Sequence, residues 1–159
     1  MKTKDRILNR TTYLFSRSGA EGVSIRDLAK DLKIAPSVIY HHFEGKSDLL
    51  ESMYIAANQK LGQDRQKLDP QETLEDRLRQ IITFQLQHIE NIVAVLKYYL
   101  TFRKSFEQNH RGFLPEKSYL HADEILTIAQ EKNEYSIPDI HMEAKIITHT
   151  INGFLLEYF

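Results

Sequence analysis

Cysteine is absent from the 159-residue chain, which excludes disulfide bonds and thiolate metal sites and makes a reducing cytoplasm the expected compartment. No stretch approaches 18 consecutive apolar residues, so no membrane span is expected. The first ten residues, MKTKDRILNR, lack the apolar core of a signal peptide. Strand-like alternation and internal repeats are also missing. The sequence therefore predicts an all-α fold.

Motifs for catalysis and metal binding are missing as well. No HExxH pair, Gly-rich phosphate loop, G-x-S-x-G elbow or paired acidic motif occurs. His41 and His42 would point about 100° apart on a helix, and His141 and His149 would lie about 12 Å apart along one. Neither pair can therefore chelate one ion. We expect neither an enzyme nor a metal site, and no cofactor.

Charge is divided unevenly along the chain, although the net charge is only −1. Residues 1–50 hold nine Lys and Arg against six Asp and Glu, whereas residues 51–159 hold twelve against sixteen. The positive end of the molecule is therefore the N-terminal third, which favours a polyanionic partner there.

The most informative stretch of the sequence lies in that positive third, in the segment SIRDLAKDLKIAPSVIYHHFEGKSDLL that begins at Ser24. Ser24 followed by Asp27 is typical of a helix N-cap, and an apolar face follows it. Pro36 suits the first residue of a second helix. The segment therefore predicts two short helices joined by a tight turn, and a third, longer helix that begins near Lys46.

The second of these helices separates into two sides. At about 100° per residue, Ile39 and Phe43 fall on one side and Ser37, Tyr40 and His41 on the other. A helix this short must be held in place by its apolar side. Its outward hydroxyl and imidazole groups suit contacts to phosphates and to base edges in a DNA major groove.

With LFSRSGAEGVS upstream of it, the segment resembles the helix-turn-helix of the TetR family of bacterial transcription regulators. The resemblance covers residues 4–50 and runs through Tyr40, Phe43, Lys46 and the pair Leu49-Leu50. It implies a three-helix DNA-binding domain over residues 1–46 and a helical effector-binding and dimerisation domain over residues 47–159.

The resemblance also implies which side chains meet DNA. Arg26 would reach a base or phosphate from the first motif helix. Base edges would be contacted by Pro36, Ser37 and His41, and phosphates by Tyr40, His42 and Lys46. The full set of expected DNA-binding positions is Arg26, Pro36, Ser37, Val38, Tyr40, His41, His42 and Lys46.

Three positions depart from the family pattern. Ala35 stands where many members have a capping Ser or Thr, so that cap is lost. Lys33 occupies the usual turn glycine and would cost about 1–2 kcal/mol if the turn needs a left-handed residue. Val38 replaces a common hydroxyl and removes one phosphate contact.

The second half of the sequence predicts further helices over residues 46–68, 71–90, 92–102 and 119–133, and a last helix from residue 138. Residues 103–118 suggest a loop or a broken helix. Aromatic side chains and His88 gather in this half, and the resemblance implies a pocket for a small apolar or aromatic effector between the middle helices, with His88 as an orienting polar group. Core packing is the alternative for each of these residues: Tyr54, Phe84, His88, Tyr98, Tyr99, Phe102 and Phe113.

The last helix carries two apolar stripes. One stripe includes Ile147, Phe154 and Tyr158 and is enough to bury the helix against its own subunit. The second stripe predicts a homodimer interface, and its alternative role is to pack on a loop of the same chain. Its members are Met142, Ile146, His149, Gly153 and Leu156. The chain stops within the apolar run FLLEYF, where family members usually continue into another long helix, which suggests a truncated product or an unusually short member.

The functional expectation is a repressor that binds a palindromic, double-stranded DNA operator as a homodimer and is released by a small-molecule effector. Two alternatives remain open. The protein could bind DNA without an effector under the control of a partner protein, or it could be a helical interaction module that no longer binds DNA.

Overall fold

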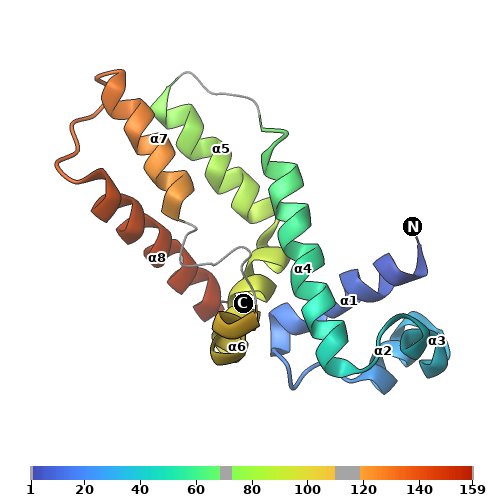
Figure 1. Ribbon diagram of the computed structural model, residues 1–159. Helices are drawn as coiled ribbons and strands as arrows, with labels where there is room; N and C mark the ends of the chain where they lie inside the picture. Colours follow the sequence, from blue (N-terminus) through green and yellow to red (C-terminus); the bar gives the residue numbers. More distant parts are fainter. Residues whose placement is uncertain (1, 69–72, 110–118, 159) are drawn as a thin grey trace.

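Every secondary-structure element is a helix in the computed structural model, which describes residues 2–68, 73–109 and 119–158 (Figure 1). The all-α expectation is therefore confirmed. No helix in these ranges is long and apolar enough to cross a membrane. The elements are α1 (Thr3–Ser18), α2 (Ile25–Leu32), α3 (Pro36–His42), α4 (Lys46–Arg65), α5 (Leu74–Gln87), α6 (Ile89–Asn109), α7 (Tyr119–Glu131) and α8 (Ile140–Tyr158).

Local signals explain where the N-terminal helices begin and end. Gly19 ends α1 with a φ of 61°, a conformation that glycine adopts without steric cost. The Ser24 hydroxyl accepts a hydrogen bond from the Asp27 N–H at 3.4 Å and so caps α2. Lys33 ends that helix in the left-handed region, at φ 55° and ψ 45°, which is the strained conformation considered for this position. Ala35 provides no side-chain cap for α3.

A continuous apolar core joins the first three helices to α4 and α6. Ile7 and Phe15 of α1, Leu49 of α4 and Tyr98 of α6 are members of this single core cluster, and each is at most 7% exposed. Helix α1 packs against both α4 and α6. The core is therefore continuous across residue 46, where the expected boundary between the two domains lies.

Helices α5 and α6 differ from the expected pattern. α5 begins at Leu74, where the Thr73 hydroxyl accepts a hydrogen bond from the Asp76 N–H at 3.2 Å, and the start expected at residue 71 lies outside the described residues. In α5, Leu78, Ile82 and Leu86 recur at steps of four, as an inward-facing stripe would, yet they are 38%, 54% and 64% exposed. α6 continues to Asn109 across a non-helical residue, Phe102, so the broken-helix expectation holds over 103–109.

Helices α7 and α8 pack against each other at the end of the molecule farthest from α2 and α3 (Figure 1). Leu126, Ile137 and Ala144 form a small core of their own between them. An ion pair made by the buried Arg77 joins this end to α5, because Arg77 Nη2 lies 2.7 Å from Glu134 Oε2. The same carboxylate oxygen accepts a hydrogen bond from the Leu74 N–H at 2.7 Å. One acidic side chain thus fixes the start of α5 beside the turn after α7.

Candidate nucleic-acid interface and ligand cavity

The side of α3 that faces outward is the one that the sequence predicts to be exposed. Ile39 and Phe43 are 0% and 2% exposed and hold the helix against the core. The Tyr40 ring is 57% exposed, and Ser37 and His41 are also exposed. The polar side chains of α3 are therefore free to reach a partner, while the apolar ones are not.

The remaining predicted DNA-binding residues lie on the same group of packed helices. Arg26 on α2 and Pro36 at the start of α3 are exposed. Val38, His42 and Lys46 are half-buried, and Lys46 is the first residue of α4. All eight predicted positions therefore come from α2, α3 and the N-terminus of α4.

Three cations of α1 support this group, a feature that the sequence reasoning missed. Arg6 Nη2 donates a hydrogen bond to the Leu32 carbonyl at 3.4 Å. Arg10 forms an ion pair with Asp31, and the Lys4 ammonium lies 5.5 Å from the centre of the Phe43 ring. The available signal was the four-residue spacing of Arg6 and Arg10, which places both on one face of α1.

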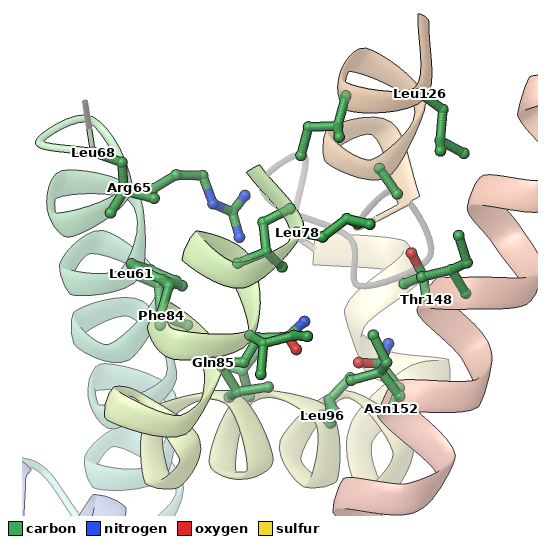
Figure 2. A pocket seen from close by; sticks show the side chains of 18 residues that line it. Leu61, Arg65, Leu68, Leu78, Phe84, Gln85, Leu96, Leu126, Thr148 and Asn152 are labelled. Atoms are coloured by element: carbon green, nitrogen blue, oxygen red, sulfur yellow. The ribbon is translucent and has the colours of Figure 1, made fainter. Parts of the chain in front are cut away.

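A cavity of about 360 Å³ lies among α4, α5, α6, α7 and α8 (Figure 2). Its walls are largely aliphatic, as in most sites for small organic ligands. Leucine and isoleucine side chains from all five helices contribute, including Leu61, Ile81, Leu96, Ile125 and Ile151. Arg65, Gln85, Thr148 and Asn152 supply the polar groups.

Most of the predicted effector residues lie elsewhere. Phe84 lines the cavity, whereas Tyr54, Tyr98 and Tyr99 are buried in the core shared with α1. The Tyr54 and Tyr98 rings stack with centroids 4.7 Å apart, and Phe102 packs on Tyr98 at the same distance. Phe113 lies outside the described residues.

His88 lies beside the cavity but does not line it. Its ring centre is 4.4 Å from that of Phe84, a cavity residue. Its Nε2 is 3.8 Å from Asp64 Oδ2 on α4. His88 therefore supports a cavity wall and faces the end of α4. No group of three or more His, Cys, Asp or Glu side chains in the described ranges could hold a metal ion.

Arg65 is the charged cavity residue that the sequence-based prediction did not include. The signal was present, because Ala57, Leu61, Arg65 and Leu68 follow one another at steps of four, four and three and so share one helical face. An arginine that continues an apolar stripe either extends its head to solvent or faces a polar partner.

The second stripe of α8 faces solvent in the described structure. Met142 and Ile146 are 54% and 51% exposed, and nothing lies within 4 Å of a Cβ placed on Gly153. His149 is also exposed, and Leu156 is half-buried.

Phe154 and Tyr158, which were expected to point inward, are 59% and 64% exposed. The inward side of α8 is held by Ala144 and Leu155, and no described element covers the other two side chains. Their rings instead contact each other, with centroids 4.6 Å apart. The exposed apolar face of α8 is therefore wider than the five predicted residues.

Comparison with known proteins supports both halves of the fold. The sequence profile of the family described as bacterial regulatory proteins, tetR family, matches residues 7–53. The transcriptional regulator UidR of Escherichia coli is 34% identical over 53 residues, which are 33% of this chain and 27% of UidR. IcaR of Staphylococcus aureus, a negative transcriptional regulator of the biofilm operon icaADBC, is 35% identical over 48 residues, 30% of this chain and 26% of IcaR. The matched part thus spans about a quarter of each relative.

The similarity to solved structures extends over nearly the whole chain. The regulator FadR of Bacillus subtilis, solved in complex with stearoyl-CoA, superposes with a TM-score of 0.61. The superposition covers 97% of this chain and 86% of FadR at 17% sequence identity. At that identity the likeness concerns the fold alone.

Proposed function

We propose that the chain, whose residues 7–53 match the family described as bacterial regulatory proteins, tetR family, is a DNA-binding transcriptional repressor of that family. The observation that carries the proposal is the construction of α3: Ile39 and Phe43 are buried, while Tyr40 and His41 are exposed. UidR and IcaR are named as transcriptional regulators, so the proposal includes no enzymatic activity.

On DNA, the proposed roles divide by chemistry. His41, Ser37 and Pro36 on the exposed side of α3 read base edges in the major groove. Tyr40 and Lys46 contact phosphates, and Lys46 does so at the N-terminus of α4, where unpaired backbone N–H groups favour an anion. Arg26, Val38 and His42 are the remaining positions of the DNA contact surface that the resemblance to the family implies.

In the second half, we place a small, largely apolar effector in the cavity between α4 and α8. Helix α4 connects the two functions, because Lys46 stands at its start and Leu61 and Arg65 line the cavity near its end. An effector can shift α4 and weaken operator binding only if it binds the two states with different affinity. The stearoyl-CoA complex of FadR supports the idea that this fold can accept an acyl ligand.

The proposed repressor acts as a symmetric dimer. The exposed apolar face of α8, with Met142, Ile146 and Gly153 at its centre, supplies a surface that a second copy could cover. A two-fold dimer presents two copies of α3 to two half-sites about one DNA turn or more apart, which requires a palindromic operator. In this scheme residues 1–46 read DNA, and residues 47–159 bind the effector and the second subunit.

The test is a binding measurement on duplexes selected from a random pool, repeated at several salt concentrations. Lys46→Ala should weaken binding similarly on all sequences and reduce the salt dependence by about one ion per subunit. His41→Ala should change which bases are preferred. Lys60→Ala, at an exposed lysine in the second half of α4, is the matched control.

Two outcomes would contradict the proposal. If Lys46→Ala and His41→Ala bound the selected duplexes like the wild type, the interface would be wrongly assigned. If the wild type selected no duplex at low salt, the chain would be a helical interaction module. Native mass spectrometry of the purified protein, in search of a retained small molecule, distinguishes a ligand-controlled repressor from one controlled by a partner protein.

A further inference from the structure

Arg65 is the one ionisable residue among the eighteen whose side chains line the cavity. Its guanidinium extends from α4 toward Leu78 on α5 (Figure 2). Its Nε atom is buried and has no hydrogen-bond partner among the described residues. A single cationic group with an unused Nε donor therefore faces a space whose other walls are aliphatic or neutral.

The surroundings of Arg65 leave its charge uncompensated. Burial lowers the pKa of Arg65 from its ordinary value, and an arginine nevertheless stays protonated in a protein. The Phe84 ring, with its centre 5.7 Å from the guanidinium carbon, offers only a cation–π contact.

Two acidic side chains of the neighbouring elements already have cationic partners. Asp64 Oδ1 pairs with Lys67 Nζ at 2.6 Å, and Glu134 pairs with Arg77 at 2.7 Å. A partly desolvated cation without an anion is costly, and an anion brought by a ligand would remove that cost.

From this geometry we infer that the ligand of the cavity is an amphipathic carboxylate, with the carboxylate on Arg65 and the hydrocarbon body against the leucine and isoleucine walls. The inference rests on the proposed function and specifies the chemical class of its effector. A guanidinium presents two parallel N–H donors to a carboxylate, which gives strong, oriented pairing. The same cation disfavours ligands that carry a positive charge.

The size of the cavity guides the choice of a hydrocarbon probe. At about 30 Å³ for each non-hydrogen atom, the share of a water molecule in the liquid, 360 Å³ holds roughly twelve such atoms. Decanoate has that number and is therefore the probe of choice. Gln85 from α5 and Asn152 from α8 extend toward the same space and can hydrogen-bond water or a polar substituent on the ligand (Figure 2).

The experiment is isothermal titration of the full chain with three probes that share one hydrocarbon body: decanoate, 1-decanol and decylamine. Decanoate should bind about tenfold or more tightly than 1-decanol, and decylamine should bind most weakly. Arg65→Gln should reduce the affinity for decanoate by about tenfold or more while leaving that for 1-decanol unchanged, and Arg65→Lys should fall between. The matched control is Arg79→Gln, because Arg79 is paired with Glu75 on the exposed side of α5.

Equal binding of decanoate and 1-decanol by the wild type would overturn the inference, and so would an unchanged affinity for decanoate in Arg65→Gln. If Arg65→Gln does not fold, as judged by far-UV circular dichroism, the comparison of the three probes on the wild type still tests the inference. Operator binding is measured separately. Tight decanoate binding by a protein that does not bind DNA would refute the proposed repressor and support the carboxylate site. Operator binding by a protein that does not bind decanoate would refute this inference alone.

Discussion

Tyr98 lies where the core of the N-terminal helices meets α6, stacked on Tyr54 and 6.2 Å, between ring centres, from Phe15. Burial raises the pKa of Tyr54 and of Tyr98 to about 12 each. In the unfolded chain both hydroxyls ionise near pH 10. The unfolded state therefore loses these protons first as the pH rises, so the stability that the neutral hydroxyls contribute is complete below pH 10 and is lost between about pH 10 and 12.

The substitution Tyr98→Phe tests the pH-dependent contribution of one of these hydroxyl groups to stability. The free energy of unfolding of the wild type should fall by about 1 kcal/mol more than that of Tyr98→Phe between pH 8 and pH 11. Urea denaturation at the two pH values, followed by circular dichroism, measures the difference. Tyr135→Phe, at a site that is 62% exposed, is the matched control. Parallel curves for wild type and Tyr98→Phe would show that this hydroxyl has no such role.

Single residues also show where prediction from sequence succeeded and where it stopped. Ser24, Gly19 and Lys33 mark helix ends through local backbone chemistry, so the N-terminal helices could be placed closely. Exposure of Phe154 depends on whether another element covers it, and a helical projection of α8 alone does not contain that information. Arg65 needed the same tertiary knowledge, since only the packing of five helices reveals the cavity that it faces.

At the scale of elements, α6 provides a second connection between the cavity and the N-terminal helices. Leu96 lines the cavity, and the next residue, Lys97, donates a hydrogen bond from its ammonium group to the Ser16 carbonyl at 2.5 Å. A second carbonyl, that of Arg17, lies 3.4 Å away. Lys97 thus satisfies carbonyl groups at the C-terminus of α1, where a cation is also favoured by the helix dipole.

Lys97→Met should therefore weaken communication between the two halves. We expect the factor by which a cavity ligand lowers operator affinity to shrink several-fold, because α1 no longer follows α6. Operator titrations with and without decanoate, or with any ligand found by native mass spectrometry, measure this factor. Lys60→Met, at an exposed site on α4, serves as control. A factor equal to that of the wild type would leave α4 as the sole connection.

At the scale of the whole molecule, the exposed face of α8 determines the expected assembly. Ile146→Glu should produce monomers that keep their helical signal but lose tight operator binding, because a buried, unpaired carboxylate is costly in the dimer interface. Light scattering at micromolar concentration and a gel shift measure the two effects. Ile55→Glu is the matched control, since Ile55 is 42% exposed on α4. A wild-type monomer, or a dimeric Ile146→Glu, would mean that α8 is not the interface.

The core that runs without a break from Ile7 to Tyr99 makes the proposed DNA-binding third of the chain unsuitable as a separately exchangeable unit. A chimaera that joins residues 1–46 to a foreign effector domain would leave Phe15 and Ile7 without the α4 and α6 side chains that now cover them. Exchange of effector domains between relatives should therefore succeed only where α4 and the first turns of α6 are transferred together with α1–α3. For the same reason, changes in specificity are more easily obtained at the exposed residues of α3 than by recombining whole halves.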